Sequence, residues 1–434
     1  MALIVQKFGG TSVANPDKIK AVADRVLLSR KQGHQMVVVL SAMAGETNRF
    51  VALANEMQSM PDPREMDVLL ATGEQVTVAL FAMAVKERGF DAVSLLGDQV
   101  KIHTDTMHTK ARITSIDTEL IRRHLKAGKV VVVAGFQGVT DNGNLSTLGR
   151  GGSDTTAVAL AAALKADQCD IFTDVEGVYT TDPNVCATAR KIDRISYDEM
   201  LELASLGAKV LDIRSVSFAK RYKVPVQVRS TFTTTEGTWV VEEDKAMESN
   251  PVSGVTYSKN EARITISKVP DKPGIASRIF TPISNEGIVV DMIIQNTRDG
   301  NLTDMTFTVP RPDYKKAMAI IEKTAKAIGA ERVTGSESIA KVSIVGVGMR
   351  NHAGIATTMF KVLSDEGINI MMISTSEIKV SCVIEEKYTE LAVRTLHDAF
   401  GLDKAPKKGT KACAACKTKG AAKATKPAVK TKKK

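Results

Sequence analysis

Residues 1–27, MALIVQKFGGTSVANPDKIKAVADRVL, contain the strand, loop and helix that decide the fold of the first half of the chain. Residues 3–6, LIVQ, which are apolar except for Gln6, predict a buried strand. Asn15 and Pro16 then supply the N-cap and the first-turn residue of a helix. The apolar positions of this helix recur at helical spacing, at Ile19, Val22, Ala23, Val26 and Leu27. A strand followed by an amphipathic helix is the repeating unit of an α/β domain.

The same alternation of strand and helix continues to about residue 245. Strands are predicted at residues 36–40, 92–95, 130–134 and 170–173, and helices at residues 65–88, 118–126 and 155–165. The strands are continuously apolar, which is typical of a parallel sheet covered by helices on both faces. Ligands of such sheets bind beyond the carboxyl ends of the strands, so we expect the active residues in the loops that follow them.

The second half of the chain contains an internal duplication. At an offset of 80 residues, segments 274–293 and 354–373 carry the same amino acid at ten of twenty positions, more than chance explains. Each copy predicts a strand, a glycine turn, a helix, a Glu-Gly turn, a strand, and then a further strand and helix. We therefore expect a catalytic domain at residues 1–245, a linker at 246–260, and two α+β regulatory units at 261–336 and 337–403.

Positive charge is concentrated at the end of the chain. The formal net charge is +10, but residues 404–434 hold twelve lysines and no acid, which leaves residues 1–403 at −2. This Lys- and Ala-rich tail has no regular apolar pattern, so we predict that it is disordered. A nucleic-acid partner is therefore expected only through the tail, if at all.

Several classes of protein are excluded by what the sequence lacks. A length of 434 residues with 43% hydrophobic residues indicates a multi-domain globular protein. No apolar run reaches the ~18 residues of a membrane span, no secretion signal is present, and the five cysteines form no disulfide framework, so a cytoplasmic protein is expected. The GxxxxGKS/T, GxGxxG, HRD, DFG and GxSxG motifs are absent as well. The histidines show no metal spacing beyond His103 and His108, which we expect to be solvated.

Two glycine-rich loops are candidate sites for an anion. In the first, Lys7 precedes Gly9 and Gly10 at the end of the first strand, so backbone amides and a mobile positive charge are available together. In the second, GRGGSDTT at residues 149–156, Arg150 lies at the start of an alanine-rich helix. An ordinary glycine turn with a solvated lysine is the alternative for the first loop. A helix cap by Ser153 or Asp154 is the alternative for the second.

Six segments together resemble the aspartate kinases of the amino-acid kinase family. They are KFGGTS at 7–12, VVVLSAMAGETN at 37–48, ATGEQ at 71–75, AGFQGVT at 134–140, LGRGGSDTTA at 148–157 and FTDVEGVYTTDP at 172–183. The duplicated units resemble the paired ACT domains of these kinases, which sense amino acids. The resemblance implies a mainly parallel, amino-acid-kinase-like α/β sheet sandwiched by helices, followed by two α+β (ferredoxin-like) ACT units.

The resemblance also implies an activity. ATP would phosphorylate the β-carboxylate of L-aspartate, giving 4-phospho-L-aspartate and ADP, the first step toward lysine, threonine and methionine. Because a carboxylate with a reference pKa of ~3.9 is already ionised at neutral pH, no general base is required. Mg²⁺ is expected to be held mainly through ATP, without direct protein ligands. Another phosphotransferase of the same fold, or a catalytically silent amino-acid sensor with a nucleic-acid-binding tail, remains an alternative.

Site residues follow from the resemblance, motif by motif. The implied catalytic residues are Lys7, Asp154 and Lys209. ATP would contact Lys7, Phe8, Gly9, Gly10, Ser41, Thr173, Asp174, Tyr179, Asp182, Lys209 and Val210. Aspartate would contact Ser41, Thr47, Glu74, Arg150, Gly151, Gly152 and Ser153, with Arg150 on its α-carboxylate and Glu74 on its α-ammonium group.

Lysine, threonine or both are the effectors that the resemblance implies. Their site in the first ACT unit would use Asp271, Gly274, Ile275, Ala276, Gln295 and Asn296. The second unit has Asn351 where the first has Asp271, so equal occupancy of the two copies is doubtful. Asn369, Ser374 and Thr375 are expected to complete the pocket of the first copy instead. A homodimer or larger assembly is also expected.

Overall fold

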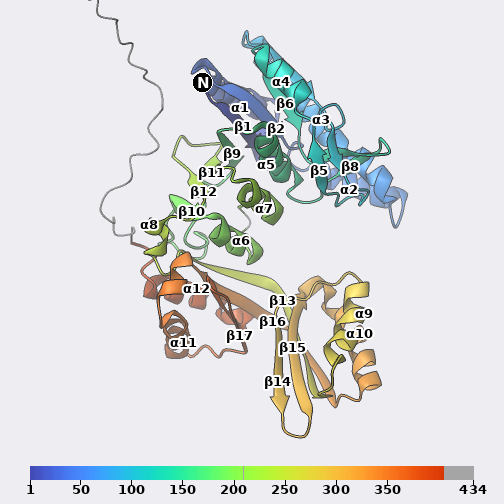
Figure 1. Cartoon of the computed structure of the whole chain (residues 1–434), viewed down its shortest axis with the longest axis vertical. Helices are drawn as coiled ribbons and strands as arrows, with labels where there is room; N and C mark the ends of the chain where they lie inside the picture. Colours follow the sequence, from blue (N-terminus) through green and yellow to red (C-terminus); the bar gives the residue numbers. More distant parts are fainter. Residues whose placement is uncertain (209, 405–434) are drawn as a thin grey trace, which may run out of the picture. The chain divides into compact units, whose positions relative to one another are not determined.

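The first half of the chain forms an eight-stranded sheet (Figure 1). The structure is a computed structural model and describes residues 1–208 and 210–404. The strand order is β10-β12-β11-β9-β1-β2-β6-β3, and among the described residues only the β11–β12 pair is antiparallel. This confirms the predicted mainly parallel sheet. The strands are β1 (Leu3–Phe8), β2 (Gln35–Leu40), β3 (Ala92–Leu95), β6 (Val130–Ala134), β9 (Gln168–Thr173), β10 (Arg194–Ser196), β11 (Val226–Ser230) and β12 (Thr238–Val241).

Helices cover both faces of this sheet because successive residues of its central strands point to opposite sides. On β2, Val38 packs with α1 (Pro16–Lys31) and α3 (Pro63–Glu87), whereas Val37 and Val39 pack with the opposite layer. That second layer contains α4 (Glu119–Lys126), α5 (Gly152–Leu164), α6 (Tyr197–Ser205) and α7 (Ile213–Tyr222). By length and composition α3 could span a membrane, but ten of its residues, including Phe81, are buried here.

Local sequence signals place the element ends well. The Asn15 side chain accepts a hydrogen bond from the backbone N–H of Lys18 at 3.0 Å, and Pro16 opens α1, as predicted. α5 begins at Gly152, three residues before the predicted start, because Gly151 with φ = 72° forms its N-cap. Not predicted were helix α2 (Glu46–Met57), a small sheet in the order β5-β4-β7-β8, and the individual elements after β9, namely β10, β11, β12, α6 and α7. The small sheet contains β4 (Ile102–Thr104), β5 (Ile113–Ile116), β7 (Gln137–Thr140) and β8 (Leu145–Thr147).

The duplicated half forms one six-stranded antiparallel sheet in the order β14-β15-β13-β16-β18-β17 (Figure 1). The two copies have matching elements, and α9 and α11 both start after a glycine, Gly274 or Gly354. The strands are β13 (Gly254–Pro270), β14 (Ile293–Arg298), β15 (Leu302–Pro310), β16 (Arg332–Val345), β17 (Met372–Thr375) and β18 (Lys379–Glu385). The helices are α8 (Lys245–Glu248), α9 (Ile275–Asn285), α10 (Tyr314–Ile328), α11 (Ile355–Asp365) and α12 (Thr389–Ala399), with short 3₁₀ turns at Gly10–Val13, Arg311–Asp313, Val347–Asn351 and Glu386–Tyr388.

The two regulatory units share their central strands. The first part of β13 pairs with the last part of β16, from Gly254 opposite Val345 to Ser258 opposite Lys341. The remainder of β13 pairs with the first part of β16, with Ser267 opposite Arg332. The segment 246–260, expected as a linker, therefore contains α8 and the start of β13. This start supplies the second unit with a fourth strand, so each unit has four strands and two helices.

Candidate active site

A cavity of about 310 Å³ lies beyond the carboxyl ends of β1, β2 and β6 and against the first turn of α5. It joins the two glycine-rich loops with the loop after β2 and the middle of α3. Ten of the predicted site residues line it, namely Lys7, Gly10, Ser41, Thr47, Glu74, Arg150, Gly151, Gly152, Ser153 and Asp154. The loops that the sequence analysis treated as separate candidates therefore form a single site.

A buried ion pair lies in this cavity. The Lys7 Nζ atom lies 2.6 Å from Asp154 Oδ1, and the two side chains are only 11% and 13% exposed. Lys7 comes from the end of β1 and Asp154 from the first turn of α5. Because burial limits the freedom of both side chains, Asp154 holds the ammonium group of Lys7 in one place. A fixed cation beside the free amides of a helix start is suited to an anionic group such as phosphate.

Glu74 is a buried carboxylate with one oxygen free. It is 3% exposed on α3, and its Oε1 accepts a hydrogen bond from the backbone N–H of Ala42 at 3.0 Å. Its Oε2 atom has no hydrogen-bond partner. Burial raises the pKa of Glu74 to about 7, against an ordinary value of 4.5. An unpaired buried acid beside a cavity is suited to binding a ligand cation such as an ammonium group.

The Arg150 loop depends on glycine at position 151. Gly151 has φ = 72°, and a Cβ atom there would lie 2.3 Å from the carboxyl carbon of Asp212. On the other side of the loop, Arg214 of α7 donates hydrogen bonds to the carbonyl oxygens of Leu148 and Arg150. The Arg150 side chain is exposed, and no side chain caps the start of α5. The alternative interpretation, a helix cap by Ser153 or Asp154, is therefore not formed, and the guanidinium of Arg150 is available to an anionic ligand.

The remaining predicted nucleotide residues lie outside the cavity lining. Thr173 is the last residue of β9 and Asp174 follows it, and Phe172 of the same strand stacks on Phe8 of β1 with ring centroids 4.5 Å apart. Tyr179 forms a β-bridge with Lys191. The Asp182 carboxylate accepts hydrogen bonds from the Tyr257 hydroxyl at 3.1 Å and from the Asn184 amide at 2.9 Å, so both of its oxygens have protein partners. Val210 packs against the core, and Lys209 lies outside the described residues.

Some lining residues were missed by the sequence analysis. Ala42, Met43, Ala44 and Gly45 follow β2, and Phe136 follows β6. Both segments lie in the loops after strands where active residues were expected, but their individual residues were not selected. These residues carry no charged side chain, so no local signal in the sequence marks them as ligand-binding.

The predicted effector residues lie at two opposite edges of the regulatory sheet. Gln295 and Asn296 are exposed on β14, and Asp271, Gly274 and Ala276 are exposed in the neighbouring segment before and at the start of α9, where Ile275 is buried. Ser374 and Thr375 lie on β17 at the other edge, and Asn369 precedes that strand. Four strands separate β14 from β17. Asn369, Ser374 and Thr375 therefore do not complete the pocket of the first copy within one chain.

The chain matches known protein families over most of its length. Residues 2–230 match the amino acid kinase family, and residues 263–326 and 342–400 each match the ACT domain. The chain is similar to the aspartate kinase of Pseudomonas putida, with 58% identity over 410 residues that cover 94% of this chain and all of that protein. It is similar to the aspartokinase of Pseudomonas aeruginosa, with 59% identity over 411 residues and the same coverage of both chains.

A solved structure also resembles this chain. E. coli aspartokinase III in complex with aspartate and ADP (R-state) gives a TM-score of 0.76 at 27% identity, covering 92% of this chain and 99% of that one. The same enzyme in complex with lysine and aspartate (T-state) gives a TM-score of 0.72 at 28% identity with the same coverage.

Proposed function

This chain belongs to the aspartate kinases of the amino acid kinase family, and we propose that its cavity transfers the γ-phosphoryl group of ATP to the β-carboxylate of L-aspartate. The products are 4-phospho-L-aspartate and ADP. This proposal rests on one observation: the Lys7–Asp154 ion pair, Glu74 and Arg150 all line the same cavity. Such a cavity offers both charge signs to a zwitterion that carries an additional carboxylate.

The phosphoryl transfer depends on charge and alignment. The attacking β-carboxylate oxygen is ionised at neutral pH, so no residue has to remove a proton. Negative charge spreads over the oxygens of the transferring phosphoryl group, and a fixed cation beside it lowers the barrier. Lys7 supplies this cation, and Asp154 orients it at 2.6 Å.

Substrate binding uses the other end of aspartate. The free Oε2 atom of Glu74 accepts the α-ammonium group, and the exposed guanidinium of Arg150 binds the α-carboxylate. Ser41 and Thr47 line the same cavity and contact the remaining oxygens, together with the segment 151–153 at the start of α5. This arrangement points the β-carboxylate toward Lys7.

The nucleotide lies along the ends of β1 and β9. Phe8, Gly9, Gly10, Ser41, Thr173 and Asp174 are the residues proposed for it here, with Lys209 and Val210 from the segment after α6. The phosphates of ATP would hold Mg²⁺, which would neutralise part of their charge.

Regulation is proposed to pass through contacts between the ACT units and α6. The Glu199 carboxylate is 1% exposed, and its Oε1 accepts hydrogen bonds from the Val347 N–H at 3.1 Å and from the Ser253 hydroxyl. Lys379 of β18 lies 2.9 Å from Glu202 of the same helix. Lysine or threonine in the ACT units would change these contacts and favour a less active state, as expected for allosteric coupling.

A homo-oligomer is part of the same proposal. The effector residues of β14 and β17 lie at opposite edges of one sheet, so a pocket made from both requires a second copy of the chain. Ile293 on β14 and Ile373 on β17 are 51% and 42% exposed, and burial of such edges is a common reason for association. The cytoplasmic location also stays a prediction, compatible with the buried free thiols of Cys169, Cys186 and Cys382.

ADP release in a coupled assay with L-aspartate and MgATP tests the function. Lys7→Ala should abolish turnover, whereas Lys20→Ala, which removes a lysine that is 60% exposed on α1, should not. Lysine and threonine added singly and together should lower the rate of the unmodified protein. Release of ADP with another acidic acceptor but not with aspartate would show a different kinase of this fold. Absence of turnover with every acceptor would favour a silent sensor.

A further inference from the structure

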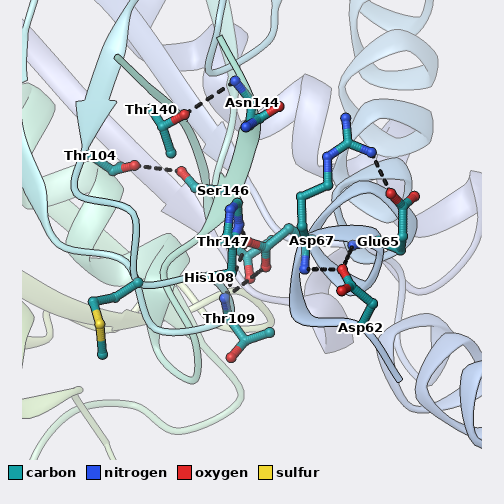
Figure 2. Close-up of polar contacts among 12 residues, drawn as sticks. Asp62, Glu65, Asp67, Thr104, His108, Thr109, Thr140, Asn144, Ser146 and Thr147 are labelled. Atoms are coloured by element: carbon teal, nitrogen blue, oxygen red, sulfur yellow. Dashed lines mark hydrogen bonds and ion pairs between the residues drawn. The ribbon is translucent and has the colours of Figure 1, made fainter. Parts of the chain in front are cut away.

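Asp67 of α3 is the most completely buried carboxylate in the catalytic half, with an exposed fraction of 0%, and it does not line the cavity. Three neighbours donate hydrogen bonds to it (Figure 2). The backbone N–H of Thr109 lies 3.0 Å from Oδ1, and the Thr147 hydroxyl donates to the same oxygen. His108 Nδ1 lies 2.7 Å from Oδ2. Because both of its oxygens accept hydrogen bonds, this carboxylate joins α3 to the two segments that supply its donors, 105–112 and β8.

His108 is therefore not solvated as the sequence analysis expected. Its side chain is only 19% exposed, because the segment 105–112 between β4 and β5 folds back onto α3 and β8. The Ala111 N–H donates to the Thr147 carbonyl at 2.9 Å and holds this segment beside β8. His103, on the same small sheet, keeps the more exposed position that was predicted, with 36% exposure and Asp141 3.9 Å away.

The residues bound by Asp67 lead directly into the Arg150 loop. Thr147 ends β8, and Gly149 follows two residues later. The Thr109 carbonyl oxygen lies 2.9 Å from the place where a Cβ atom of Gly149 would be, so the segment 105–112 packs on the start of the loop without intervening space. A shift of His108, Thr109 or Thr147 would therefore move the backbone that carries Arg150.

Asp67 and Glu74 lie on the same face of one rigid helix. They are seven residues apart on α3, which is about two helical turns, and both are buried. Glu74 faces the cavity, while Asp67 holds the strand that leads to Arg150. Asp67 is thus one link between Glu74 and Arg150, beside the hydrogen bonds that Arg214 donates to the loop. Glu74 and Arg150 are the two groups that the proposed function assigns to the α-ammonium and α-carboxylate of aspartate.

We infer that Asp67, with His108 and Thr147, is a positioning cluster that fixes the Arg150 loop relative to Glu74 and thereby sets the affinity for the amino-acid end of aspartate. The inference rests on the proposed function. It assigns no contact with ATP to the cluster, so its loss should affect the two substrates unequally.

The test measures kcat and KM for aspartate and for ATP in His108→Leu and Thr147→Val. Each variant removes one donor to Asp67 and keeps a similar volume. The KM for aspartate should rise about tenfold or more while the KM for ATP changes by less than about twofold, as expected for a displaced binding group. His108→Asn keeps an N–H donor near the position of Nδ1, so it should restore the KM for aspartate. His103→Leu, in the same sheet, is the matched control and should leave both values unchanged.

Melting temperatures of all variants separate positioning from simple stability. A lower melting temperature with an unchanged KM for aspartate would overturn the inference, as would parallel rises in both KM values or failure of His108→Asn to restore binding. If His108→Leu does not fold, Thr147→Val decides alone, since it exchanges only a hydroxyl for a methyl group. The unmodified protein is assayed first. Failure to phosphorylate aspartate there would refute the proposed function and not the positioning role.

Discussion

Glu74→Gln should make the protein more stable and less active at the same time. The substitution keeps the size of the side chain and the oxygen that accepts the Ala42 N–H. It removes a carboxylate that is buried with one oxygen unpaired. The charge that binds the α-ammonium group of aspartate is thus the same charge that burial penalises.

The size of the stability gain follows from the pKa of Glu74. Burial raises that pKa from 4.5 to about 7 in the folded protein. Between these two values the folded state binds more protons than the unfolded state, so Glu74 lowers stability as the pH rises through this interval. At about 1.4 kcal/mol per pH unit, the ionised side chain costs about 3 kcal/mol above pH 7. Glutamine does not ionise, so we expect Glu74→Gln to gain up to about 3 kcal/mol at pH 8 and almost nothing below pH 4.5.

The loss of activity should depend on pH in the opposite way. With a pKa of about 7, roughly one tenth of Glu74 is ionised at pH 6 and nine tenths at pH 8. Because only the ionised form binds the ammonium group, kcat/KM for aspartate should rise about tenfold between these pH values in the unmodified protein. In Glu74→Gln this rise should be absent, and kcat/KM at pH 8 should be lower by about tenfold or more, the cost of losing a hydrogen bond to a charged group.

The assay is the initial rate of ADP release at low aspartate and saturating MgATP, from pH 5.5 to 8.5, with denaturant unfolding at pH 4.5 and pH 8. The phosphates of ATP titrate near the same range and affect every variant alike, so the difference between the variants isolates Glu74. Glu65→Gln, which replaces an exposed acid on the same helix, is the control. A pH profile of Glu74→Gln that parallels that of the unmodified protein, or a loss of stability at pH 8, would refute the reasoning.

Three further predictions concern the Arg150 loop, the regulatory contact and the metal. Gly151→Ala places a Cβ atom against Asp212 at a positive φ, so kcat/KM for aspartate should fall by about tenfold or more. Gly143→Ala, where φ is 77° and nothing lies within 4 Å, should lower only the melting temperature. In Glu199→Gln, an N–H₂ group replaces one of the two carboxylate oxygens that accept hydrogen bonds from the Val347 N–H and the Ser196 N–H. Because this weakens the contact between α6 and the ACT units, lysine or threonine should inhibit less than in the unmodified protein at equal concentrations. A chelator should stop ADP release yet leave the melting temperature of the nucleotide-free protein unchanged, because Mg²⁺ is proposed to be held through the phosphates of ATP.

Much of the candidate site could be predicted because its residues belong to short segments with local signals. Glycine pairs, a lysine at a strand end and an arginine before a helix indicate an anion site from their own chemistry. The structure unites Lys7, Arg150 and Asp154 in one cavity, as the rule for parallel sheets requires. The hydrogen bond from Tyr257 to the Asp182 carboxylate could not be predicted, because a partner 75 residues away leaves no local trace in the sequence.

Local chemistry in the sequence alone determined the alternation of strands and helices over residues 3–173, the N-cap at Asn15 and the duplication of the regulatory unit. The hydrophobic period and the capping residues act over only a few residues. The repeat can be found by comparing the chain with itself. Tertiary structure alone decided that β13 and β16 are shared by both regulatory units, that Asp67 binds His108, and that Glu74 is buried with an elevated pKa. These features depend on which segments, distant in the sequence, pack together and exclude water from each side chain. Only the packing of the whole fold decides that.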